Sequence, residues 1–473
     1  MLKNKLFLIA FFGTILAVFW QELNLFFLHG NFPYSHGLIT CADEVSYLKP
    51  ARNFFETGIW STKSKGIIGY FMRPPGFGLY YLTLLSVFGK NVWFAMKIAQ
   101  VLFSFFSVIL FYKSLKLLKV NNKAIYILSI VFAFLPCYSG FMYFTITESI
   151  SPFFMLLTTY FWIKSYQKKD QSLYGFILSG SFLILIRPQL IVFIILFSIF
   201  LLLKLKWKNG LLLPLVFLPF LLWNIRTFTI AKKWMAIHPI YHETNNSLYR
   251  PNHEKMTNLF RIWDYRGDVF HTTMANLSAD TNEVNLKKAL NNVPLKYQSK
   301  VKGIFKEYQQ LEFYRQSQFK DKAIKTYFKG EIAFGKRLDE TVKRLKKENK
   351  LDFYLKTPFQ SLKKLIVSSQ MNLKIFQEDF RGYFWCEILR WICLLVLISS
   401  YFFSFIYFLK FKWNAFTMLS IGISASFFYL AYVQRMNEER YLTPILPLAL
   451  LMVGAYFINT KSDDKDSESE KSL

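Results

Sequence analysis

Long apolar runs restrict this chain to folds that are stable in a lipid bilayer. The runs at Leu6–Phe19, Leu190–Leu203 and Ile388–Leu409 approach or reach the roughly 20 apolar residues that a helix needs to cross a membrane. Of the 473 residues, 53% are hydrophobic and 53 are Phe, which is more apolar than is typical of a soluble protein. The sequence therefore predicts an all-α polytopic membrane protein, with the lipid bilayer as a partner.

The distribution of basic residues predicts the orientation of the chain. Short Lys/Arg clusters occur at 113–123, 164–169, 204–208 and 410–412, and the positive-inside rule assigns each cluster to the cytoplasmic side. An even number of crossings then separates neighbouring clusters, which predicts a bundle of about ten helices (10–12) with both termini cytoplasmic. The predicted spans are 5–28, 92–117, 122–142, 147–163, 172–187, 189–205, 210–228, 384–409, 413–433 and 441–459.

The apolar stretch 76–89 is the exception in this count. At about 14 residues it is too short for a full crossing, and counting it would invert every later segment. We therefore expect an interfacial or re-entrant helix within the first external loop.

The formal net charge of +28 raises the question of a nucleic-acid partner. Cytoplasmic loops that set topology and contact anionic lipid explain basic residues more simply, so no nucleic-acid partner is expected. The predicted location is the plasma or inner membrane, with the candidate site on the extracytoplasmic face.

Composition divides the chain into four predicted parts. They are an N-terminal transmembrane module (1–228, with the first external loop at 31–91), a mostly helical extracytoplasmic insert (229–383), C-terminal transmembrane helices (384–459) and a disordered cytoplasmic tail (460–473). The acidic motif in the first external loop makes 1–228 the expected catalytic module. Within the insert, Pro294, Gly303 and Gly330 are expected to separate several helices.

Two adjacent acids, Asp43 and Glu44, follow the first predicted span. A carboxylate held at the membrane surface can deprotonate an acceptor beside a lipid-borne substrate. The alternative is that both acids cap the helix expected at 43–56, where negative charge favours a helix N-terminus.

The predicted topology brings many other ionisable residues to the same extracytoplasmic face. Membrane-edge charges are costly, and each is therefore a functional-site hypothesis. Besides Asp43 and Glu44 they are Arg73, Glu148, Arg187, Arg226, Arg435, Glu438, Glu439 and Arg440.

Several short motifs carry a resemblance to a known family. They are Asp43-Glu44-x-x-Tyr47, Ala51-Arg52, Gly58-x-Trp60, Arg73-Pro74-Pro75-Gly76, Thr147-Glu148-Ser149, Ile186-Arg187-Pro188, Trp223-Asn224-Ile225-Arg226 and Glu439-Arg440-Tyr441-x-x-Pro444. In this order the set resembles the polyprenyl-phosphate-sugar-dependent glycosyltransferases of the GT-C superfamily. The closest likeness is to protein O-mannosyltransferases, lipid A aminoarabinose transferases and bacterial glycosyltransferase family 39. The resemblance covers about 1–228 and 430–458. Glu148 departs from the pattern, because several relatives carry Asp there.

This resemblance implies a membrane glycosyltransferase that moves a sugar from a polyprenyl-phosphate donor to a glycolipid, a cell-envelope glycan or a protein, with inversion. Asp43 would be the general base, and Glu44 and Glu148 further catalytic candidates. The lipid phosphate or sugar would be bound by Arg73, Arg187, Arg440, Tyr47 and Arg226. For Tyr47 we favour packing, for Glu148 helix capping is a competitor, and Arg226 and Arg435 are equally typical of membrane-boundary anchors.

No cofactor is required by this reading, and a divalent metal, although compatible with it, is not indicated. His238, His242 and His253 lack the Cys or acid that would complete a recognisable ligand set.

Two other functions remain open from the sequence. A transporter or flippase of lipid-linked sugars would show broken helices or repeated halves, and the sequence has neither pattern. A non-catalytic membrane scaffold would bind an acidic polymer through Lys and Arg in 284–350, and would tolerate the loss of Asp43 and Glu44. We expect the insert to decide the choice of acceptor.

Overall fold

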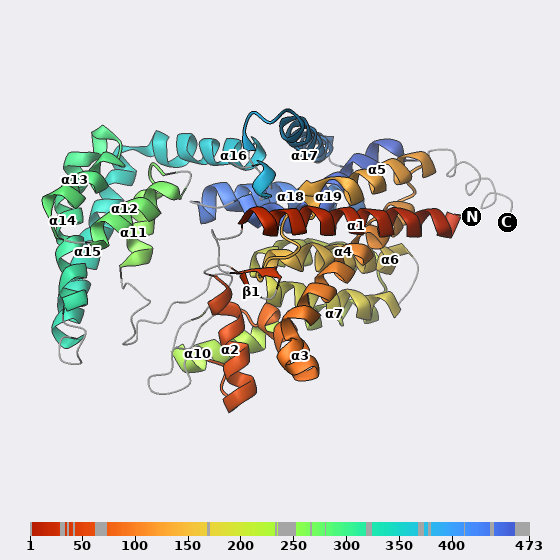
Figure 1. Cartoon of the computed structure of the whole chain (residues 1–473), viewed down its shortest axis with the longest axis horizontal. Coiled ribbons are helices and arrows are strands. Elements are labelled where there is room, and N and C mark those ends of the chain that lie inside the picture. Colours follow the sequence, from red (N-terminus) through yellow and green to blue (C-terminus); the bar gives the residue numbers. More distant parts are fainter. Residues whose placement is uncertain are drawn as a thin grey trace. The chain divides into compact units, whose positions relative to one another are not determined.

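The protein is described by a computed structural model, shown in Figure 1. It describes residues 2–28, 34–35, 37–40, 43–61, 73–167, 171–231, 234, 252–264, 267–279, 281–317, 324–367, 373–376, 380–410, 412–435 and 439–458. These residues are almost wholly helical. The strands among them, β1 (Tyr34–Ser35) and β2 (Leu38–Ile39), form one antiparallel pair. The predicted all-α class is confirmed. The predicted tail at 460–473 lies outside the described residues.

The chain divides into two compact units. Unit 1 comprises Met1–Ile240, Ile366–Ser426 and Glu439–Leu473, and unit 2 comprises Tyr241–Leu365 and Phe427–Glu438.

In unit 1, α4 packs against α1, α5 and α6, α6 packs against α7, and α17 packs against α19. The α-helices are α1 (Leu2–Leu28), α2 (Glu44–Thr57), α3 (Gly76–Phe88), α4 (Val92–Leu117), α5 (Asn122–Phe134), α6 (Ser151–Gln167), α7 (Gln171–Ile186), α8 (Ile191–Leu202), α9 (Trp207–Gly210), α10 (Leu218–Ala231), α17 (Phe384–Lys410), α18 (Ala415–Phe428, whose last two residues belong to unit 2) and α19 (Leu446–Val453). Short 3-10 segments join them: η1 (Gly89–Asn91), η2 (Pro136–Tyr138), η3 (Thr147–Ser149), η4 (Pro188–Leu190), η5 (Leu213–Phe217), η7 (Lys374–Phe376), η10 (Glu439–Ile445) and η11 (Gly454–Phe457).

Five helical segments among the described residues are long and apolar enough to cross a membrane. They are Asn4–Phe27, Gly76–Leu117, Phe384–Lys410, Ala415–Gln434 and Arg440–Phe457. These segments are compatible with a membrane protein, whereas the bundle of about ten spans stays a prediction. Four further apolar helices are shorter: Asn122–Phe134, Ser172–Ile186, Pro188–Leu202 and Leu213–Thr229.

Proline explains one of these shortened helices. The sequence predicts a span at 122–142, but α5 ends at Phe134. Leu135 adopts an extended backbone and Pro136 begins a 3-10 turn, because proline restricts the residue before it and cannot donate the helical hydrogen bond.

A sharp break separates α3 from α4, at the end of the stretch for which a separate helix was predicted. Gly89 has a φ of +52°, a conformation that residues with a Cβ rarely adopt, and η1 follows at once. The 13-residue α3 is therefore an element of its own.

Unit 2 is a helical domain with its own aromatic core, in which Phe260, Phe305 and Phe334 are fully buried. Its helices are α11 (His253–Phe260), α12 (Asp268–Ala279), α13 (Glu283–Asn291), α14 (Leu295–Ser317), α15 (Ile324–Glu348) and α16 (Thr357–Val367, which extends past the unit boundary at Leu365), with π-helical turns η6 (Asp352–Lys356) and η9 (Tyr429–Gln434).

One prediction for the insert is right at a proline and wrong at two glycines. Pro294 directly precedes α14, as expected of a helix-breaking residue. Gly303, however, lies inside α14, and Gly330 lies inside α15. A glycine costs a helix interior only about 1 kcal/mol relative to alanine, and a long helix packed on a core tolerates that loss.

Candidate functional site

A short backbone ladder brings the two acidic motifs together. Ile39 of β2 donates its N–H to Tyr143 O at 2.9 Å, and Thr145 donates its N–H back to Ile39 O at 3.0 Å. Asp43 follows Ile39 along the chain, and Glu148 follows Thr145. Carboxylates that are far apart in sequence are thus positioned at the same place in unit 1.

A close helix contact explains the glycine of the Arg-Pro-Pro-Gly motif. A Cβ on Gly76 would lie 2.4 Å from Ile186 N, so only glycine allows the start of α3 to approach the end of α7 this closely. Arg73 lies just before α3, and Arg187 lies just after α7, where Pro188 begins η4. The contact therefore brings both arginines to one region.

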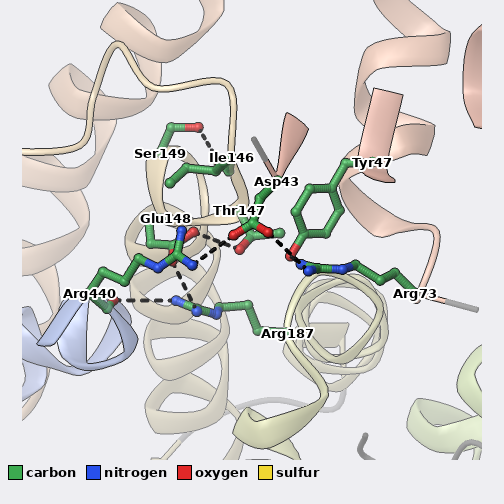
Figure 2. Close-up of polar contacts among 9 residues, drawn as sticks. All are labelled: Asp43, Tyr47, Arg73, Ile146, Thr147, Glu148, Ser149, Arg187 and Arg440. Atoms are coloured by element: carbon green, nitrogen blue, oxygen red, sulfur yellow. Dashed lines mark hydrogen bonds and ion pairs between the residues drawn. The ribbon is translucent and has the colours of Figure 1, made fainter. Parts of the chain in front are cut away.

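The carboxylate of Asp43 is held between two arginines, as Figure 2 shows. Oδ1 accepts from Nη2 of Arg73 at 3.1 Å, and Oδ2 accepts from Nη2 of Arg440 at 2.7 Å. Arg440 belongs to η10, which packs against η3 and α6. Asp43 occupies the N-cap position of α2 but makes no side-chain capping hydrogen bond. The Asp43 carboxylate therefore does not form a hydrogen-bonded cap, although its charge lies at the N-terminus of α2.

Two opposing effects set the pKa of Asp43. Burial raises the pKa, because it penalises the charged form, but the Arg73 and Arg440 guanidiniums outweigh burial and lower it. The net direction is below the ordinary value of 3.8. Asp43 is consequently ionised at neutral pH.

Glu148 forms the buried half of the same cluster. Its Oε1 pairs with Arg187 Nη2 at 3.2 Å and with Arg440 Nε at 3.6 Å, and its Oε2 accepts from Thr147 Oγ1 at 2.9 Å. The side chains of Glu148 and Arg187 are only 3% and 5% exposed. Arg440 therefore bridges an accessible carboxylate and a buried one. We call Asp43, Arg73, Glu148, Arg187 and Arg440 the carboxylate–arginine network.

Tyr47 supports the network through Arg73. Its hydroxyl accepts from Arg73 Nη1 at 2.5 Å, and its ring packs edge-on against Phe77 with centroids 5.8 Å apart. The expected packing role of Tyr47 is thus joined by a polar one, which fixes the direction of the guanidinium.

The contacts described for Glu44 are to residues outside the network. Glu44 Oε2 accepts from Thr145 Oγ1 at 2.5 Å, and burial raises the pKa of Glu44 despite opposing effects from Thr145 and Arg52. Glu44 also lies in the first turn of α2, where a negative charge favours the helix, but burial outweighs this effect and raises the pKa of Glu44.

Arg226 contacts two tryptophans. It donates from Nη2 to Trp60 O at 3.0 Å and lies over the Trp223 ring at 4.5 Å. The two tryptophan rings are 6.1 Å apart, so Arg226 ties the segment that follows α2 to α10.

The sequence analysis assigned no role to the two threonines that hold the acids, although Thr147 belongs to one of the motifs. Thr145 and Thr147 each donate a hydroxyl hydrogen bond to a carboxylate, Thr145 to Glu44 and Thr147 to Glu148. The only signal in the sequence is the spacing Thr-x-Thr-Glu, and hydroxyl residues near an acid are too common to be informative alone.

A small cavity adjoins Glu148. It has a volume of about 50 Å³, and its polar lining includes Gln100, Ser104, Ser107 and Ser149. A cavity of this size holds a few water molecules. The side chain of Asp43, by contrast, is 30% exposed.

Within the described part of the chain, no group of three or more His, Cys, Asp or Glu side chains could hold a metal ion. His238 and His242 lie outside the described residues.

Comparisons with known proteins give no relative for this chain. No family model, no curated protein and no solved structure matches it. The carboxylate–arginine network and the motifs that supply its residues are therefore the features that bear on function.

Proposed function

We propose that this protein is a membrane glycosyltransferase that moves a sugar from a polyprenyl-phosphate donor to an acceptor on the extracytoplasmic face. The observation that carries the proposal is the ion pairing of Asp43, an accessible carboxylate, with Arg73 on one oxygen and Arg440 on the other. A base next to paired guanidiniums is what direct displacement of a phosphate leaving group needs. The order of the motifs, which resembles that of GT-C glycosyltransferases, supports the same reading.

In the proposed reaction, Asp43 takes the proton of the acceptor hydroxyl or amine. The acceptor atom forms a bond to the anomeric carbon while the bond from that carbon to the phosphate oxygen breaks, and the electron pair leaves with the lipid phosphate. Attack opposite the leaving group inverts the anomeric configuration.

Formal charge in the network favours a phosphate ligand. Three guanidiniums and two carboxylates give 3 − 2 = +1, so one added negative charge balances the site. Arginine suits this role because its planar fork of donors matches phosphate oxygens.

Donor binding also offers a way to activate the base. While paired with Arg73 and Arg440, Asp43 has a lowered pKa and is a weak base. A donor phosphate that attracts the same guanidiniums would weaken both pairs and raise the pKa of Asp43. The base would then become effective only when the donor is bound.

Glu148 is assigned a positioning role in this proposal. Its carboxylate is buried and already paired with Arg187 and Arg440, so it orients the arginines rather than meeting the acceptor. Tyr47 positions Arg73 in the same way. Glu44 and Arg226 remain candidates for sugar or lipid contact at the edges of the network.

The proposal extends to the membrane arrangement. It requires about ten spans, an inner- or plasma-membrane location, both termini in the cytoplasm and the carboxylate–arginine network outside. The five long apolar segments support the membrane environment.

Mass spectrometry of cell-envelope glycolipids, glycans and proteins tests this function. Cells that lack the chain should lose one glycosylated species, the wild-type chain should restore it, and Asp43→Asn should not. Glu56→Gln is the matched control, since Glu56 is an exposed acid on the same helix α2. If a folded Asp43→Asn variant restored the glycosylated species, the proposed function would be refuted.

A further inference from the structure

A second group of cations lies in unit 2, around one phenylalanine ring. The Arg435 guanidinium carbon lies 3.7 Å from the ring centroid of Phe353, and the Lys346 ammonium lies 4.6 Å from the same centroid. Arg435 is 5% exposed and donates from Nη1 to Arg261 O and from Nε to Tyr432 O, each at 3.0 Å. Three cationic residues from α15, the end of α11 and the end of η9 thus meet.

No acid balances Arg435 or Lys346 among the residues that the structure describes. Their hydrogen bonds and ring contacts are to carbonyls and to Phe353. Burial lowers the pKa of Lys346, and the charges of Arg435 and Arg261 lower it further. Burial and the charge of Arg261 likewise lower the pKa of Arg435 to about 10. Cations held together away from water are unfavourable unless an anion accompanies them.

Four basic residues elsewhere in unit 2 are paired with acids. The pairs are Lys255–Asp339, Lys296–Asp352, Lys300–Glu348 and Arg337–Glu307. Four partly exposed cations of this domain thus have an acidic partner, whereas the described residues supply none to the more buried Arg435 and Lys346. An anionic ligand would supply a counter-charge to both residues.

The backbone at Arg435 is also unusual. Its φ of 49° lies in a region that residues with a Cβ rarely adopt, and such strain gathers at functional sites. Arg435 directly follows the candidate membrane span Ala415–Gln434, which places it at the point where the chain would leave the bilayer. Phosphate groups of lipids are found at that level of a membrane.

We propose that Arg435, Lys346 and Arg261 form a site for a phosphate group. Guanidiniums offer forked donors to phosphate oxygens, and an ammonium adds a point charge. The phosphate belongs either to a lipid headgroup or to a soluble phosphate. The site does not depend on the glycosyl transfer proposed above, and its test measures binding without activity.

Thermal unfolding of the full chain in maltoside detergent, which lacks phosphate, tests the site. Inorganic phosphate is titrated in one arm, and phosphatidylglycerol in mixed micelles in the other, with chloride at matched ionic strength as the reference. A ligand that binds the folded state raises the unfolding temperature in a saturable way. Lys346→Gln should weaken the apparent affinity about tenfold or more, the usual effect of losing one charge-assisted contact.

The matched control is Lys347→Gln, which removes the same charge from an exposed neighbour on α15 and should leave the affinity within about twofold. Arg435→Gln is a second variant, although Arg435 also holds two backbone carbonyls, so its loss can unfold the protein. Lys346 makes no such hydrogen bond in the described residues. Its substitution should therefore leave the protein folded, so the effect on binding can be measured.

A response to inorganic phosphate identifies a soluble phosphate, and a response to phosphatidylglycerol alone identifies a lipid headgroup. The proposal is overturned if neither probe stabilises the wild-type chain beyond chloride. It is also overturned if Lys346→Gln and Lys347→Gln bind equally well.

Discussion

The buried pair of Glu148 and Arg187 gives a quantitative test of how unit 1 is assembled. At 3.2 Å and an effective dielectric constant of about 20, two unit charges attract by roughly 5 kcal/mol. Glu148→Gln keeps the shape of the side chain and an acceptor for Thr147, but leaves Arg187 buried without its partner charge. Breaking one half of a buried pair costs about 3–5 kcal/mol of unfolding free energy.

A double-mutant cycle separates this pairing from other effects of the substitutions. Glu148→Gln, Arg187→Met and the double variant are each unfolded in detergent, and their unfolding free energies are compared with the wild type. Because the double variant leaves no lone buried charge, the two costs should be non-additive by about 2 kcal/mol or more. The exposed pair Lys255–Asp339 serves as a control and should couple by only about 0–1 kcal/mol. Additivity of Glu148 and Arg187 within about 0.5 kcal/mol would refute the pairing.

Three further predictions follow from the same geometry. Gly76→Ala should lower the unfolding free energy by about 1–3 kcal/mol or more, measured by chemical denaturation, because its Cβ would overlap the α7 backbone. Arg440→Lys should reduce product formation about tenfold or more in a transfer assay, since one ammonium cannot replace the two nitrogens that reach Asp43 and Glu148. Glu44→Gln should stabilise the protein at pH 7, and this gain should vanish in melting experiments towards pH 4. The sign follows from the raised pKa of Glu44. Protonated Glu44 stabilises the folded state below the ordinary pKa of 4.5, and this stabilisation is lost as the pH rises and the buried side chain becomes charged.

Each of these predictions has a contrary outcome. Gly303→Ala, at a helix position with open space around it, should instead stabilise by about 0.5–1 kcal/mol, so equal effects at Gly76 and Gly303 would exclude the helix contact. Unchanged transfer by Arg440→Lys would remove Arg440 from the site. A Glu44→Gln effect that does not vary with pH would show that burial does not perturb Glu44.

Much of the helical structure follows from local sequence. The predicted helix at 43–56 corresponds to α2 (Glu44–Thr57), and the predicted separate helix at 76–89 corresponds to α3, which ends at Gly89. Local reasoning failed where packing outweighs propensity, as at Gly303 and Gly330, which continue through long helices. Local reasoning also overestimated the length of α5. The apolar composition continues past Pro136, but the helix ends before this proline.

The members of the carboxylate–arginine network were all among the predicted site residues, because charge at a membrane edge is rare enough to be informative. Their pairing was not predictable. Nothing local indicates that Arg440 bridges Asp43 and Glu148, or that β2 forms a ladder with the backbone at Tyr143. These contacts depend on long-range backbone approach, which no periodicity in the sequence encodes.

Sugar transfer by purified protein in liposomes tests most directly whether Asp43 is the general base of a glycosyltransferase. A labelled polyprenyl-phosphate sugar serves as donor, and membranes from cells that lack the chain supply the acceptor. Asp43→Asn should lower the transfer rate about 100-fold or more, as expected for the loss of a general base, while Glu56→Gln should change it less than about twofold. Transfer by a folded Asp43→Asn variant at the wild-type rate would exclude Asp43 as the general base.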